Sequence, residues 1–348
     1  MSASSTEPDR TETHRPFREA ITGRSAALVL GVLALQLAFI YSYVGAFHQP
    51  KPHHIPIDVV APAPMADQLV SSLDALPDEP LSARAVADAD TARTAVRNGS
   101  RAAALIIDPA GTTDTLLVAG AAGSGLSDAV ERIVVAVQQQ QDRQLTVEDL
   151  VRPQPGDNRG LTTFYLVVGW LVGGYLAAAA LGGARGARPA TWQRAVVRLA
   201  SMVPYAVVSG IGGALLVDTV LGALTGHFWT LAWVGALLVL AASATALALQ
   251  ILWGLIGIGV TLLVFVIIGN PSAGGAFPLP LLPPLWREVG PWLPGGAGVT
   301  AIRRFVYFEG HNGWQPVLVI VGWCVAGSVL MLAAAALLHR HRRLPGPG

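Results

Sequence analysis

Long apolar runs alternate with polar stretches along this chain of 348 residues, and the apolar runs predict membrane-spanning helices. A helix needs about 20 apolar residues to cross roughly 30 Å of hydrocarbon. Six runs meet this need: 26–47, 161–181, 199–217, two within 229–269, and 315–338. From Thr219 to Trp286 the chain contains no Asp, Glu, Lys or Arg. The pattern predicts an α-helical polytopic membrane protein with six transmembrane helices.

The run at 229–269 has to be divided into two spans. As one helix it would be about 61 Å long at 1.5 Å per residue, twice the hydrocarbon thickness. Tilting does not absorb such an excess. We therefore expect a tight hairpin at residues 250–254, where Gln250 and Gly254 interrupt the apolar run.

Arginines flank the predicted spans in three groups, at 10–24, 185–198 and 340–343. The positive-inside rule places all three groups in the cytoplasm, which requires an even number of spans. We thus expect a multi-pass protein of the plasma (inner) membrane with cytoplasmic segments at 1–25 and 339–348. The first apolar run is longer than the 7–15 residues of a signal-peptide core, so we interpret 26–47 as a retained anchor.

The polar segment 48–160 separates the first span from the five-helix region at 161–338. It holds 15 acidic and 9 basic residues, and its hydrophobic pattern alternates short strands with amphipathic helices. Candidate strands are 57–60, 81–86, 102–107 and 115–118, and candidate helices are 65–76, 90–97 and 127–143. The segment is predicted to be a small extracytoplasmic α/β domain.

Composition narrows the function classes. Hydrophobic residues make up 52% and charged residues 13%, against about 25% charged in soluble domains. The net charge of +1 offers no basic face for nucleic acid. The one lysine, Lys51, lies between two prolines, so the chain has no P-loop. Any ATP hydrolysis would have to come from a partner subunit.

Few residues indicate chemistry. His48, His53 and His54 lie near Asp58 and could bind a metal, but the surrounding prolines favour a solvated stalk. The one cysteine, Cys324, cannot form an internal disulfide. The middle of each span lacks ionisable residues, which argues against a secondary transporter or an intramembrane hydrolase. We expect no catalytic residues, metal or cofactor in this chain.

Small residues are frequent in the predicted spans, for example Gly169, Gly173, Gly174, Gly210 and Gly212. Such residues allow helices to approach closely. The helices in question could belong to one chain or to two subunits, and the sequence does not separate these alternatives.

Two further segments stand out. The cytoplasmic segment 185–198 combines an aromatic residue with basic ones: Arg185, Arg188, Trp192, Arg194 and Arg198. Ordinary positive-inside anchoring and an interfacial helix that faces lipid phosphates or a partner both explain it. In 270–314, seven prolines fall between Pro271 and Pro294, which is typical of an outer segment that lies in the interface or dips into the membrane domain.

These residues carry a family likeness. The stretch NPSAGGAFPLPLLPPLW at 270–286, followed by PWLP at 291–294 and AIRR at 301–304, resembles the signature before the last span of the YhgE/Pip (phage-infection-protein) group of ABC-2 type membrane proteins. Residues 90–97 and 101–109 resemble a helix and a Pro-terminated strand of its outer domain. The order of spans is also similar. The outer domain is shorter than is usual in that group.

The resemblance implies an ABC-2 permease. In such proteins an N-terminal amphipathic helix, here 16–23, and the 185–198 loop face the separate ATPase. The segment between the last two spans, here 279–308, forms re-entrant helices. The residues assigned to that outer segment are Asn270, Pro271, Pro278, Pro283, Trp286, Trp292, Arg303 and Arg304.

The expected function is that of an exporter permease. It would work as a homodimer or paired permease with a cytoplasmic ABC ATPase, surrounded by membrane lipids, and move a hydrophobic or amphipathic substrate outward. The alternative is a non-transporting envelope scaffold or receptor that binds a partner through its outer domain.

Overall fold

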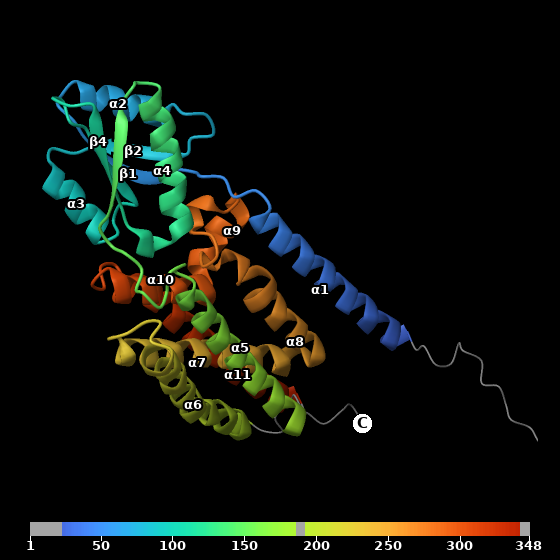
Figure 1. The fold of residues 1–348 in the computed structure, drawn as a ribbon. Helices are drawn as coiled ribbons and strands as arrows, with labels where there is room; N and C mark the ends of the chain where they lie inside the picture. Colours follow the sequence, from blue (N-terminus) through green and yellow to red (C-terminus); the bar gives the residue numbers. More distant parts are fainter. Residues whose placement is uncertain (1–22, 186–191, 342–348) are drawn as a thin grey trace, which may run out of the picture.

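The computed structural model describes residues 23–185 and 192–341, which form a small sheet domain above a bundle of long helices (Figure 1). The sheet domain is residues 55–149. Its strands are β1 (Ile55–Val60), β2 (Leu81–Ala85), β3 (Ala103–Ile106), β4 (Thr113–Val118) and β5 (Gln144–Asp149), and its helices are α2 (Met65–Asp74), α3 (Ala89–Arg97) and α4 (Ser124–Gln139). The remaining helices are α1 (Gly23–Phe47), α5 (Thr162–Arg185), α6 (Trp192–Ala214), α7 (Phe228–Trp253), α8 (Leu255–Leu262), α9 (Pro284–Val289), α10 (Pro294–Tyr307) and α11 (Trp314–His341).

Five helices of the described chain are long and apolar enough to cross a membrane. They cover Ser25–Phe47, Thr162–Ala184, Trp192–Val220, Phe228–Trp253 and Trp314–Leu338. The prediction of a polytopic helical membrane protein is confirmed at this level. The remaining predicted span, Leu255–Ile268, is a shorter apolar helix whose second half has π-helical geometry.

The predicted interruption near residue 254 is present. Gly254 ends α7 with a φ of +59°, a conformation that glycine adopts without steric cost. Its N–H donates to the carbonyl of Gln250 at 2.8 Å, and α8 begins at the next residue. A Cβ on Gly257 would collide with the backbone of Leu249, so a side chain here would separate α8 from the end of α7.

Helix α7 is the centre of the bundle. Its most apolar window is 78% buried, whereas the corresponding windows of α5, α6 and α11 are 28% buried and that of α1 is 6% buried. Leu231, Leu238 and Leu247 of α7 are fully enclosed by the surrounding helices. Helix α1 therefore contributes little to the core and lies at the side of the bundle.

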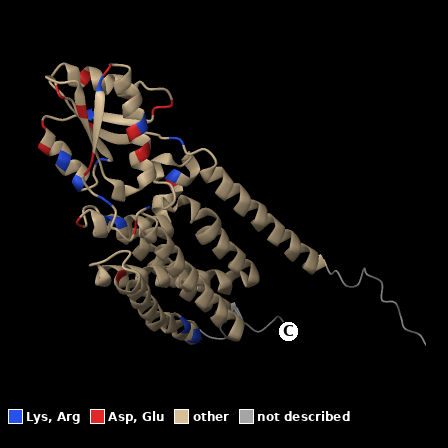
Figure 2. Cartoon of the chain, in the orientation of Figure 1, with Lys and Arg blue, Asp and Glu red and all other residues tan. Residues whose placement is uncertain are grey.

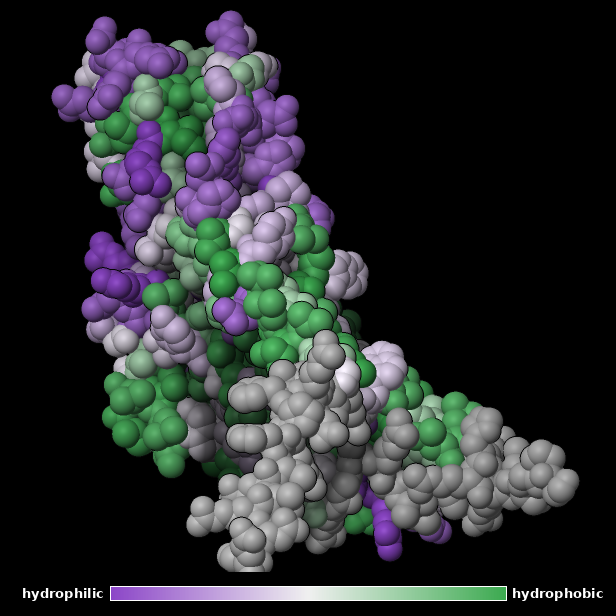
Figure 3. All heavy atoms as spheres, turned by 90° about the vertical axis from the view of Figure 1, so that its right-hand side faces the viewer, coloured by the Kyte–Doolittle hydropathy of each residue, from purple (hydrophilic) through white to green (hydrophobic). Residues whose placement is uncertain are grey.

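The sheet has the strand order β2-β1-β3-β4-β5, in which β3 and β4 are antiparallel and the other neighbours are parallel. Helices α2 and α4 pack on one face through Leu73 and Val130, and α3 packs on the other through Ala92 and Val96. The α/β pattern expected for this region is present, although the edge strand β5 was not predicted. On the face shown in Figure 3, polar residues cover much of this domain, while apolar residues predominate on the coloured surface of the helices.

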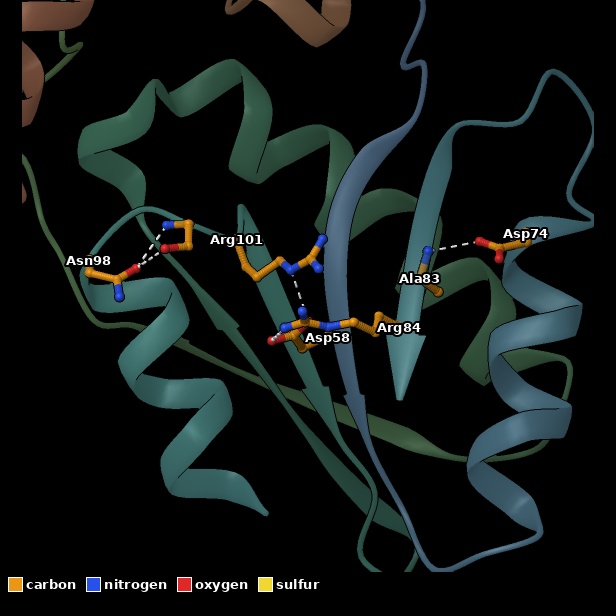
Figure 4. A network of polar contacts seen from close by, with 7 residues as sticks. Asp58, Asp74, Ala83, Arg84, Asn98 and Arg101 are labelled. Atoms are coloured by element: carbon orange, nitrogen blue, oxygen red, sulfur yellow. Dashed lines mark hydrogen bonds and ion pairs between the residues drawn. The ribbon is translucent and has the colours of Figure 1, made fainter. Parts of the chain in front are cut away.

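A buried carboxylate joins the parallel strands of the sheet domain (Figure 4). The side chain of Asp58 on β1 is fully buried and faces Arg84 on β2, at 3.1 Å, and Arg101 before β3, at 3.0 Å. A buried charge needs such partners because burial removes its hydration. Asp58, which the sequence placed beside a histidine cluster, is thus a structural residue of the sheet.

Candidate functional site

An apolar groove lies between α1 and the α7–α8 turn. Its volume is about 870 Å³; α1 supplies one wall from residues 27–35, and residues 253–263 supply the other. None of the described residues that line it is ionisable. Leu28 and Val32 of α1 and Ile256 of α8 stay at least two-fifths exposed there. Such a surface can hold hydrocarbon and offers nothing to a hydrated ion.

The other half of α1 is attached to the bundle. Trp286 donates from Nε1 to the Ser42 hydroxyl at 3.0 Å, and its ring lies against Gly45, where an added Cβ would come within 2.9 Å. Asn270 donates to the hydroxyl of Tyr43, also at 3.0 Å. The sequence-predicted residues Asn270 and Trp286 therefore hold α1 at one end, whereas the groove lies at its other end.

The Pro-rich segment after α8 is a series of short helices between the bundle and the sheet domain (Figure 1). Pro271, Pro284 and Pro294 each occupy a first helical position, where the missing N–H has no cost. Pro283 immediately precedes α9. The ring of Pro278 packs against Gly123 of the sheet domain, and a Cβ added to Gly123 would lie 2.6 Å from the Cγ of Pro278. The segment predicted to fold back on the membrane domain thus contacts both parts of the molecule.

Arg303 of α10 is the most enclosed charged residue of this segment. Its guanidinium donates to the carbonyl oxygens of Gly274 at 2.8 Å, Gly160 at 3.1 Å and Gly275 at 3.2 Å. These carbonyls belong to the Pro-rich segment and to the link that precedes α5. One buried cation therefore joins α10 to two stretches of backbone.

Neighbouring residues of α10 bind the sheet domain. Arg304 donates to the carbonyls of Asn98 at 3.1 Å and Gly99 at 2.9 Å, at the end of α3. Phe308, just after α10, is buried in the core beneath α3. Tyr307 donates to the Asp157 carboxylate at 2.9 Å. We call residues 303–308 with these partners the junction.

Two residues that contact Tyr307, Asp157 and Gln154, were missed from the sequence. The second carboxylate oxygen of Asp157 accepts from the N–H of Thr162 at 2.9 Å and so caps the start of α5. The side chain of Gln154 accepts from the N–H of Thr225 at 2.7 Å and donates to its carbonyl at 3.2 Å. An acidic residue shortly before an apolar run is a helix-start signal, so Asp157 could have been found. Gln154 has no comparable signal.

The predicted coupling residues lie at the opposite end of the bundle. Basic residues there occupy the end of α6 remote from the sheet domain (Figure 2). Trp192 is half exposed and Arg194 is exposed, but Arg198 is buried within the bundle. Arg185 is the last residue of α5, whereas Arg188 and nearly all of the predicted helix at 16–23 lie outside the described residues. Arg198 was expected to face a partner, and its burial does not agree with that expectation.

The histidines near α1 and Trp292 of the Pro-rich segment were also singled out from the sequence, and each makes contacts within the protein. The rings of His53 and His54 stack at 4.0 Å, and His54 bonds the carboxylate of Glu79 at 2.8 Å, which lowers the pKa of Glu79. The ring of Trp292 is exposed, and its carbonyl accepts from Trp323 at 2.8 Å. No cluster of three or more His, Cys, Asp or Glu suited to a metal occurs within 23–185 and 192–341.

Comparison of the chain with protein-family models, curated proteins and solved structures gives no match.

Proposed function

We propose that this chain is the membrane subunit of an ABC-type exporter that moves a hydrophobic or amphipathic substrate outward across the plasma membrane. The observation that supports this best is the groove between α1 and α8. Apolar residues form its walls, Leu28 and Val32 of α1 are exposed, and the groove lies within the part of the chain expected to be in the membrane. A substrate with a hydrocarbon portion would enter it from the bilayer.

The energy would come from a separate ATPase, because the sequence has no P-loop. We place its contact at the end of the bundle that carries Trp192 and Arg194, with both termini on the same side. In this ABC-2-like arrangement Leu255–Ile268 would be the fifth of six crossings, completed by the short helices that follow it. A second copy of the chain or a related permease would complete the translocation path.

The partner is tested by affinity purification from native membranes in mild detergent, with mass spectrometry of the recovered proteins. We expect a nucleotide-binding subunit with the unchanged chain and its loss with Arg188→Glu combined with Arg194→Glu, because charge reversal repels an acidic partner surface. Arg198 is left unchanged because it is buried. Arg132→Glu, on an exposed position of α4, is the matched control and should retain the ATPase.

Recovery of envelope proteins without any ATPase would contradict the exporter proposal and favour the scaffold alternative. Loss of the ATPase with Arg132→Glu as well would show that the effect is not specific to the proposed contact.

The groove itself is tested by filling it. Gly31 lines the groove and a Cβ added there meets no atom within 4 Å, so the side chain of Gly31→Trp begins in open space at the groove wall. Val29, two residues earlier on α1, is exposed and does not line the groove, so Val29→Trp is the control. In cells that lack the native chain, we expect Val29→Trp to restore efflux of a hydrophobic dye such as Nile red and Gly31→Trp to reduce it severalfold. Equal efflux by the two variants would contradict transport through the groove.

A further inference from the structure

A second, smaller cavity lies where α1 ends, and its chemistry differs from that of the groove. Its volume is about 270 Å³. Three separate segments line it: the chain just after α1, the turn before β2, and the start of α9. Its principal side chains are Lys51, His53, Asp78, Leu282, Pro284 and Arg287.

The charged side chains of this pocket have few polar partners among the described residues of the protein. The side chain of Arg287 is only 21% exposed, yet its one polar contact among the described residues is a 3.7 Å ion pair to Glu288, which is 77% exposed. A guanidinium covered to this degree normally makes several short hydrogen bonds. Lys51 and Asp78 are exposed, and within the described chain they make no side-chain hydrogen bond or ion pair, so both are free to meet a ligand. Two cations and one carboxylate thus line a small cavity without satisfying one another.

The pocket lies where the membrane surface is expected, at the end of a candidate spanning helix. Phe47 is the last residue of the helix that is apolar enough to span, and Lys51 follows four residues later. Trp286, next to Arg287, has its ring 6.3 Å from that of Tyr41 on α1. Aromatic residues of this kind are enriched at the level of lipid headgroups. Figure 1 shows α9 beside this end of α1, so the pocket would open at headgroup level.

We propose that this pocket binds the headgroup of a phospholipid, with the phosphate between Lys51 and Arg287 and the amino group of a phosphoethanolamine toward Asp78. The two cations and the carboxylate complement the signs of charge on that headgroup. Leu282 and Pro284 supply the apolar side that the glycerol portion would contact. The site does not depend on export, because it lies at the attached end of α1 and shares no lining residue with the groove.

The site is tested by native mass spectrometry of the purified full chain after exchange with defined lipids. Phosphatidylethanolamine should be retained more than phosphatidylglycerol, and diacylglycerol, which lacks the phosphate, should be retained least. Lys51→Gln and Arg287→Gln should each weaken retention of both phospholipids about tenfold, the effect of losing one charge-assisted hydrogen bond. Asp78→Asn should remove the preference for phosphatidylethanolamine over phosphatidylglycerol. Arg132→Gln is the control and should bind as the unchanged chain does.

Several results would overturn the proposal. Equal retention of diacylglycerol and phospholipid would show that no headgroup is recognised. Unchanged binding by Lys51→Gln and Arg287→Gln would place the lipid elsewhere; Lys51 is exposed, so its variant keeps the fold. Equally tight binding of soluble glycerophosphoethanolamine would identify a free phosphate ester as the ligand. The assay contains no ATPase, so its outcome is separate from that of the exporter proposal.

Discussion

Replacement of Arg303 by methionine is expected to lower the thermal unfolding midpoint of the purified full chain by about 6 °C or more. The guanidinium donates to three carbonyls, and methionine would leave them buried without their donor. Hydrogen bonds to charged groups contribute about 1.5–3 kcal/mol each, and an abandoned buried acceptor carries its own desolvation cost. The free energy of unfolding should therefore fall by about 3 kcal/mol or more. For a large domain, each kcal/mol lowers the midpoint by about 2 °C, which gives the expected shift.

The fall in the unfolding midpoint should depend on how many of the three carbonyls keep a hydrogen-bond donor. Arg303→Lys keeps the charge but presents a compact ammonium on a flexible stem, so it can reach fewer of the three carbonyls. We expect an intermediate midpoint for this variant. Arg132→Met removes an exposed arginine from α4 and should leave the midpoint almost unchanged. Equal midpoints for Arg303→Met and Arg132→Met would show that the carbonyl contacts do not stabilise the fold.

Gly210→Ala is expected to destabilise the bundle by about 2–3 kcal/mol, whereas Gly212→Ala on the same helix should be neutral or slightly stabilising. A Cβ on Gly210 would lie 2.8 Å from the backbone nitrogen of Ala236 and would collide with the carbonyl of Ala232, so α6 and α7 would have to separate. Overpacking against backbone falls at the high end of the cost of inserted methyl groups. A Cβ on Gly212 meets no atom within 4 Å, so only the higher helix propensity of alanine remains, worth up to about 1 kcal/mol.

The measurement is the thermal unfolding midpoint and the yield of monodisperse protein for the two single-methyl variants. Because both changes add the same atoms to the same helix, their difference isolates the α6–α7 contact. Similar behaviour of the two variants would contradict close packing at Gly210. The result also bears on the small residues in the spans, since Gly210 and Gly174 contact α7 of the same chain. Packing within one chain therefore accounts for these two positions.

Most boundaries of the spanning helices could be predicted closely because the hydrophobic signal is local, but α6 begins at Trp192 rather than at the predicted residue 199. The predicted span 26–47 is α1, and the predicted interruption at 250–254 contains Gly254, where α7 ends. The edge strand β5 was missed for the converse reason. None of its residues is buried, and Leu145 and Val147 alternate with polar residues over too few positions to indicate a strand.

The candidate sites were only partly accessible from the sequence. Trp286 and Asn270 were singled out as members of a Pro-rich segment, but their partners Ser42 and Tyr43 lie 244 and 227 residues away. No local pattern encodes a contact over that separation. For Arg198 the local pattern was misleading. Its basic character suggested a partner-facing role, which its burial in α6 does not support.

The sequence by itself determined that this is a helical membrane protein with a separate α/β domain, because the free energy of burying a helix in a bilayer is close to a sum over its own residues. Only the tertiary structure decided that α1 is attached to the bundle at one end and lines a groove at the other, and that Arg303 joins α10 to two backbone stretches. It also decided that Lys51, Asp78 and Arg287 share one pocket. These features depend on which distant segments pack together, and that is settled by shape and hydrogen bonding across the whole fold.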